Sequence, residues 1–148
     1  MPQSSIFPLI MICLGGAAVA LQAPINASLS RSVQSPVTAA AVSFAIGFAV
    51  LLGLSLATGG TGAIARLASV PIWQLAGGLL GAFYVWSMIS GVAGLGVVTA
   101  IAAMIFGQLV AALILDQVGA FGIVAQPISL TRVAAVLLVA AGLVLSRF

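Results

Sequence analysis

Five long apolar runs occupy nearly all of the 148 residues, and short stretches of glycine, proline and polar residues separate them. A helix needs about 20 predominantly apolar residues to cross the hydrocarbon core of a bilayer. The pattern therefore predicts five transmembrane helices within one transmembrane domain, residues 1–148. Their expected ranges are about 6–30, 36–57, 71–91, 97–115 and 130–147. The predicted fold class is all-α integral membrane.

The composition supports a membrane protein and leaves little room for other classes. Apolar residues make up 64% and charged residues 3%, whereas soluble domains carry about a quarter charged residues. The pI of 10.7 comes from four scattered arginines and one acid, so no basic stripe exists to follow nucleic acid. Histidine is absent, and Cys13 stands alone. We therefore expect no enzymatic activity, no cofactor and no metal site.

A signal peptide is the alternative interpretation of the N-terminal run, because Ala18-Val19-Ala20 resembles a signal-peptide cleavage site. The preceding residues Met1–Ser5 carry no lysine or arginine, which a signal peptide would need. We expect the run to be retained as a membrane span.

Polar side chains lie close together at the end of the first apolar run. Gln22 and Asn26 are four residues apart and share one helix face, while Pro24 predicts a kink or break between them. Polar amides beside an interrupted membrane helix usually mark a cavity or a packing interface. Alternatively, the two amides merely cap a frayed helix end.

Other polar and aromatic side chains are candidates for the same cavity. Tyr84 and Trp86 follow a glycine-rich turn, although Trp86 also suits an interfacial aromatic belt. Gln108 lies mid-span, where it either contacts solute or bonds another helix. Ser43 lies on a ridge of small residues with Ala39 and Gly47. The expected lining of a solute site is Gln22, Asn26, Ser43, Tyr84, Trp86 and Gln108.

The fourth run carries the longest ridge of small residues, and it ends in the only acid of the chain. Four small residues recur at four-residue intervals and predict the tightest helix contact, through packing within the chain or through dimerisation: Thr99, Ala103, Gly107 and Ala111. Asp116 ends this span, and Arg132 begins the next on the same side of the membrane. We expect a structural ion pair, with gating as the alternative. The linker between them stays apolar and is expected in the membrane interface or folded into the protein.

The arginines are evenly divided between the two sides of a five-span protein. Arg66 and Arg132 fall on the N-terminal side, and Arg31 and Arg147 fall on the other. The positive-inside rule then gives almost no preferred orientation. We therefore expect insertion in both orientations (dual topology) and an antiparallel homodimer with inverted-repeat symmetry. A fixed orientation set by weaker cues, or pairing with an oppositely oriented sister protein, are the alternatives.

Several motifs, in the right order along nearly the whole chain, resemble one known family. They are Leu21–Leu29, Val42–Gly47, Gly77–Val85, Gly107-Gln108-Leu109, Leu115-Asp116, Gly119, Phe121-Gly122, Pro127 and Arg132. The chain resembles the YdcZ-like family of small five-helix bacterial inner-membrane proteins in the drug/metabolite transporter superfamily. The resemblance implies a multi-pass inner-membrane protein, with dual-topology, paired and fused members, and it implies no defined substrate. Related small multidrug-resistance exporters exchange drug for protons at a first-helix glutamate, which this chain lacks.

The expected function is a secondary transporter or exporter that alternates access across an antiparallel dimer interface. Neutral polar and aromatic walls favour a neutral, zwitterionic or weakly charged small molecule. The alternatives are a small dual-topology ion channel and an accessory membrane subunit that does not transport. The expected partners are a second copy of the chain, the lipid bilayer and this small molecule.

Overall fold

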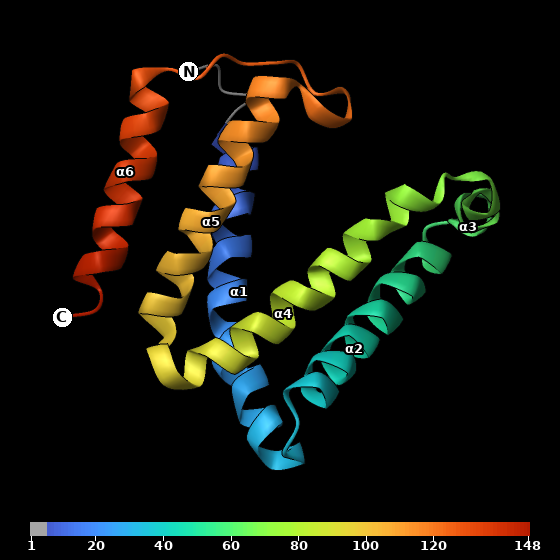
Figure 1. Cartoon of the computed structure of the whole chain (residues 1–148). Helices are drawn as coiled ribbons and strands as arrows, with labels where there is room; N and C mark the ends of the chain where they lie inside the picture. Colours follow the sequence, from blue (N-terminus) through green and yellow to red (C-terminus); the bar gives the residue numbers. More distant parts are fainter. Residues whose placement is uncertain (1–5) are drawn as a thin grey trace. The chain divides into compact units, whose positions relative to one another are not determined.

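The computed structural model describes residues 6–148, and within them it contains helices and turns but no strand (Figure 1). The α-helices are α1 (Ile6–Val33), α2 (Pro36–Ala57), α3 (Thr61–Arg66), α4 (Ala76–Leu95), α5 (Val97–Val118) and α6 (Leu130–Leu145). Short 3-10 turns occupy Leu67–Ser69, Ile72–Leu75 and Ala120–Gly122. Contacts divide the chain into two compact units, one ending at Ala93 and the other beginning at Gly94.

Four segments are long and apolar enough to cross a membrane: Ile6–Val33, Pro36–Ala57, Ile72–Leu95 and Val97–Val118. The all-helical membrane class is therefore confirmed. Helix α6 has only 16 residues. At 1.5 Å per residue it measures about 24 Å, less than the hydrocarbon thickness of about 30 Å. The fifth span stays a prediction.

Helix α1 runs without a break through Pro24, so of the two predicted possibilities the break is wrong and the kink stays a prediction. Proline removes one backbone hydrogen bond, at a cost of about 3 kcal/mol. Ending the helix there would leave several backbone groups unpaired, which costs more in lipid than in water. Continuing the helix to Val33 is the cheaper solution.

Glycine decides where two of the other helices end. Helix α4 continues through Gly91 and Gly94 and stops only before Gly96, which has a left-handed φ of +77°. Helix α5 extends past Asp116 to Val118, and Gly119 then adopts φ +61° while its N–H bonds the Asp116 carbonyl. A left-handed C-cap of this kind strongly favours glycine. The expected end at 91 was too early because a glycine within a helix does not by itself end it, and the end at 115 was too early because the helix continues through Asp116 to the Gly119 cap.

Serine caps begin two helices. The Ser35 hydroxyl accepts a hydrogen bond from the Thr38 N–H at 3.1 Å, with Pro36 at the first helical position, as the sequence predicts. The Ser129 hydroxyl accepts one from the Arg132 N–H at 3.3 Å and begins α6. Both serines are themselves in extended conformation, so they mark where the chain enters each helix.

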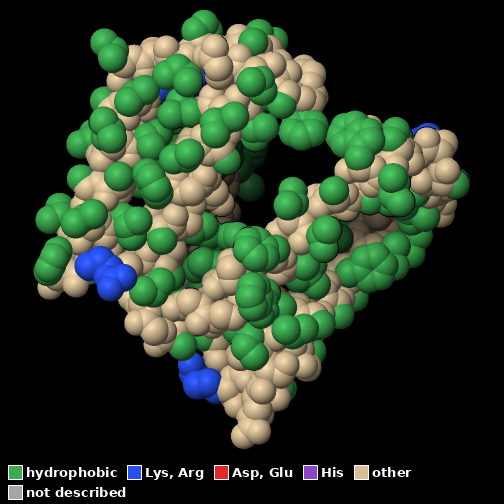
Figure 2. Space-filling model, viewed as in Figure 1, with side chains coloured by type: hydrophobic (Ala, Val, Ile, Leu, Met, Phe, Trp, Pro, Cys, Tyr) green, Lys and Arg blue, Asp and Glu red, His purple; other side chains and the backbone are tan. Residues whose placement is uncertain are grey.

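In the first unit, small residues of α2 allow α1 to approach closely, and α4 adds side chains to the same core. Ala39 is fully buried and forms a core with Ala40, Val85 and Ile89. Leu29 of α1 and Tyr84 of α4 pack against it. In the second unit α5 and α6 run side by side (Figure 1). Most large apolar side chains of the described residues stay exposed, as lipid-facing helices require, and the space-filling view shows arginine only at scattered places (Figure 2).

Candidate functional site

The polar face of α1 lies against α2 in the first unit. Asn26 is buried, and its side-chain amide Nδ2 donates a hydrogen bond to the Ser43 hydroxyl at 3.2 Å. Gln22 lies one turn earlier and is exposed. Because the helix continues to Val33, neither amide caps a helix end, and that alternative is excluded.

A polar groove of about 360 Å³ opens beside this hydrogen bond. Gln22 contributes an amide from α1, Ser43 contributes a hydroxyl from α2, and Val85 closes the groove from α4. The rest of the wall is apolar, and the full lining is Gln22, Ser43, Phe44, Gly47, Phe48, Leu51 and Val85. A molecule bound here would meet two neutral polar groups on an otherwise apolar wall.

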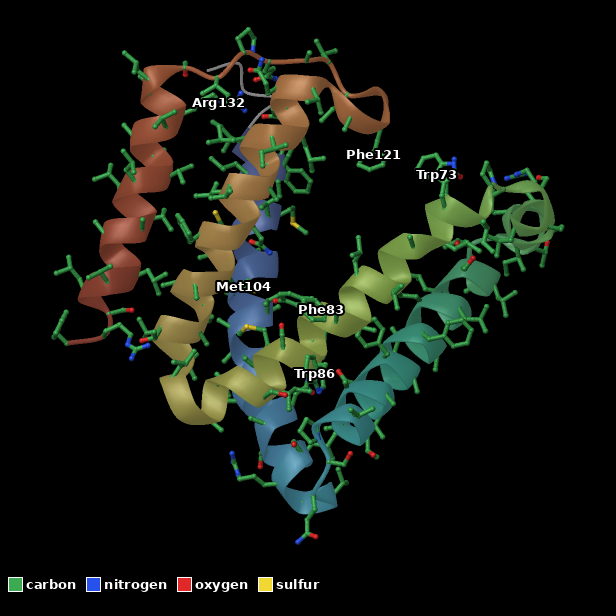
Figure 3. The ribbon with its side chains drawn as sticks, in the orientation of Figure 1. Trp73, Phe83, Trp86, Met104, Phe121 and Arg132 are labelled. Carbon is green, nitrogen blue, oxygen red and sulfur yellow. The ribbon has the colours of Figure 1, made fainter. Side chains whose placement is uncertain are left out.

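An aromatic groove of about 370 Å³ lies between α2 and α4 and shares Phe44 with the polar groove. Phe83 and Trp86, labelled on α4 in Figure 3, have ring centroids 6.0 Å apart and planes inclined by 43°. Such a tilted pair is a favourable aromatic arrangement. The lining is Val37, Ala40, Ala41, Phe44, Leu79, Ala82, Phe83 and Trp86. Trp86 therefore belongs to a groove wall in this unit.

Tyr84 lies with Gln22 and Asn26 around a third, much smaller space of about 10 Å³. This volume is at the lower limit for one water molecule, so Tyr84 closes the gap between α1 and α4 more than it opens a cavity. Five of the six predicted lining residues thus lie around neighbouring spaces of the first unit. The sixth, Gln108, is exposed on α5 in the second unit.

Two apolar members of the wall were missed as site residues. Phe44 lines both grooves, and Phe48 lies one turn further along α2. The available signal was their spacing, because Phe44, Phe48 and Leu51 recur at intervals of four and three and share one helix face. Every residue predicted to line the site carries a polar atom in its side chain, and these two phenylalanines carry none.

The ridge on α5 makes a close contact only at its beginning. Thr99 is buried, and its hydroxyl donates to the Ser146 carbonyl of α6 at 2.9 Å. Ala103 is half-buried, whereas Gly107 and Ala111 are exposed. Within this chain the helix contact therefore involves the beginning of the ridge, and a dimer contact at Gly107 and Ala111 stays a prediction. Four-residue steps rotate by about 40° each on a straight helix, so a long ridge turns away from one neighbour.

At the other end of α5, Arg132 Nη2 forms an ion pair with the Asp116 carboxylate (Arg132 is labelled in Figure 3). The side chains are 32% and 28% exposed, so the pair lies at the edge of the unit. This is the structural pairing that the sequence predicts, and a gating role stays a prediction. The described residues contain no group of three acidic, histidine or cysteine side chains that could hold a metal.

One comparison with known proteins gives a match. A family model described as "Putative inner membrane exporter, YdcZ" matches residues 7–145, nearly the whole chain. No curated protein and no solved structure matches.

Proposed function

Because the chain belongs to the YdcZ family of inner-membrane exporters, we propose that it exports a neutral, zwitterionic or weakly charged small molecule. The observation that carries this proposal is the pair of grooves that share Phe44. Neither groove is lined by a charged side chain. A strongly ionic solute would find no opposing charge there, and an unpaired charge inside a membrane is costly.

The two grooves suggest how one solute would be held. Its polar part would meet Gln22 and Ser43, and its apolar part would lie on Phe83 and Trp86. Asn26 would act through Ser43, because their hydrogen bond orients the hydroxyl. A neutral amphipathic molecule fits this division of the wall better than a purely polar one.

The proposed transport unit is an antiparallel homodimer that alternates access across its interface. Two arginines lie on each side of the membrane if α6 crosses it, which removes the usual orientation cue. The later parts of both ridges are open, since a side chain built at Gly47 or Gly107 would meet no atom within 4 Å. Small exposed residues of this kind allow a second helix to approach closely.

We infer that the protein has no enzymatic role and needs no cofactor. The only carboxylate of the sequence belongs to Asp116, which is paired with Arg132, and the sequence contains no histidine. General acid–base catalysis would therefore lack its usual groups.

Reconstitution in liposomes tests the proposed function. A panel of neutral, zwitterionic and charged solutes is screened for uptake, with and without a pH gradient. Saturable, slow uptake of neutral or weakly charged solutes supports the carrier, whereas large ohmic currents would identify a channel. If the purified protein transports no solute and only associates with a larger complex, the accessory role is correct.

Variants of the groove connect the activity to the site. We expect Ser43→Ala and Asn26→Ala to lower uptake about two- to tenfold, the effect of losing one polar contact of 0.5–1.5 kcal/mol. Ser90→Ala on the exposed side of α4 is the control, because Ser90 lines neither groove. Equal losses in all three variants would contradict the assigned site.

A separate variant tests Gln108, because this residue lies in the second unit and lines neither groove. Gln108→Leu is expected to weaken uptake while the dimer persists on cross-linking. If the dimer is lost instead, Gln108 is a packing residue and is removed from the site.

A further inference from the structure

Residues 119–129, which join α5 to α6, form an apolar segment (the strap). It contains no charged residue, and only Gln126 and Ser129 have polar side chains. Its large apolar side chains are exposed, with Phe121 at 78% and Val124 at 84%. Figure 3 shows Phe121 on the loop that follows α5. In water, such a loop would expose a continuous apolar surface without compensation.

The strap is nevertheless held in one conformation by bonds to the end of α5. The Gln126 N–H donates to the Asp116 carbonyl at 2.8 Å, and the Ile128 N–H donates to Gln117 Oε1 at 2.9 Å. The Arg132 guanidinium, already paired with Asp116, also donates to the Gln126 carbonyl at 3.5 Å. Backbone groups satisfied in this way can leave water at a much lower cost.

The length of α6 indicates where the strap lies. Its 16 residues span about 24 Å, about 6 Å less than the hydrocarbon core. Helix α5, with 22 residues, reaches about 33 Å and ends where the strap begins. For α6 to cross the same bilayer, the apolar chain just before Leu130 has to supply the missing depth.

We propose that the strap is a membrane-interface anchor that inserts its apolar side chains into the edge of the bilayer and completes the short fifth span. Asp116, Gln117 and Arg132 form the clasp that makes insertion possible, because all three bond strap backbone groups and because Asp116 and Arg132 neutralise each other's charge. The occupant of the apolar surface is lipid, since the surface continues directly from a membrane-spanning helix. This inference is independent of which solute is transported.

Site-directed spin labelling of the full-length protein in phosphatidylcholine–phosphatidylglycerol vesicles tests the proposal. In a Cys13→Ala background, a nitroxide is placed at Val124→Cys. Its collision rates with oxygen, which concentrates in lipid, and with a water-soluble nickel chelate are compared. Thr61→Cys, at the start of α3, serves as the water reference, and Ile114→Cys, exposed on the membrane-spanning helix α5, serves as the lipid reference.

The proposal predicts an oxygen-to-nickel ratio at position 124 close to that at 114 and well above that at 61. A ratio like that at 61 would place the strap in water and overturn the proposal. Low collision rates with both reagents would place it against protein, for example a second copy, and would also overturn it. Adding Gln117→Leu is expected to shift the ratio at 124 toward the water reference and to narrow the nitroxide spectrum. An unchanged ratio and spectrum would remove Gln117 from the clasp.

Discussion

The two units of the chain use polar side chains in different places. In the first unit the buried polar contact joins two neutral groups, Asn26 and Ser43, and it lies beside the grooves. In the second unit the polar contacts lie at the two ends of the α5–α6 pair, with Thr99 and Ser146 at one end and an ion pair at the other. The first arrangement suits a surface that meets solute, and the second fastens two helices together.

The units share one feature, a ridge of small residues that packs at its beginning and then opens. Ala39 has no exposed surface, while Gly47, eight residues later, is exposed. Thr99 is buried, while Gly107, also eight residues later, is exposed. The rotation of about 40° at each four-residue step accounts for both cases. Each ridge thus holds its own unit together at one end and leaves a free face at the other.

The largest expected effect comes from overfilling the closed end of the first ridge. Ala39→Leu adds three carbon atoms where no surface is exposed, and it should destabilise the protein by about 1–3 kcal/mol. It should also abolish uptake, because Val85 contributes both to this core and to the polar groove. Stability is measured by unfolding in mixed detergent micelles containing increasing dodecyl sulfate.

Ala49→Leu is the matched control for this substitution, since Ala49 lies on the exposed side of α2. It should change stability by no more than about 0.5 kcal/mol. If Ala39→Leu proved as stable as this control, the packing of side chains from α1, α2 and α4 around Ala39 would be wrong.

A smaller effect is expected in the second unit, at the start of the strap. Gly119 and Gly122 both have left-handed φ angles, so alanine at either costs about 1–2 kcal/mol of backbone energy. Only at Gly119 would the new Cβ meet close neighbours, the Ile123 carbonyl oxygen at 3.1 Å and the Ala125 Cβ at 3.2 Å. Gly119→Ala should therefore cost about 1 kcal/mol more than Gly122→Ala in the same unfolding assay. Equal costs would mean that the strap does not fold back onto the end of α5.

The sequence predicts more of the helices than of the site, for a physical reason. Apolar runs identify membrane helices because lipid leaves the backbone no other hydrogen-bonding partner. The helix end at Gly91 and the possible break at Pro24 were misjudged because turn preferences measured in water weigh less than unpaired backbone groups in lipid. The local sequence thus predicts where a membrane helix occurs, whereas it predicts only in part the residues at which the helix ends.

The site depends on contacts between helices, which the sequence does not contain directly. The spacing of Gln22 and Asn26 placed them on one face, but nothing in that spacing identifies Ser43 as the hydrogen-bond partner. The ridge from Thr99 to Ala111 predicted a packing face and did not reveal that contact ends after Ala103. Phe44 was missed because an apolar residue in an apolar helix carries no signal of its own.

The smallest expected effect is the coupling between Asn26 and Ser43, which distinguishes a hydrogen bond from packing alone. A double-mutant cycle of Asn26→Ala and Ser43→Ala should give a coupling energy of about 0.6 kcal/mol in the unfolding assay, the average for polar contacts between membrane helices. In uptake, the double variant should lose little more than either single variant, because Asn26 acts through the Ser43 hydroxyl. Independent, multiplicative losses in uptake would mean that Asn26 contacts the solute directly. The neutral pair would then be two separate binding groups, and the contrast with the fastening contacts of α5 and α6 would become sharper.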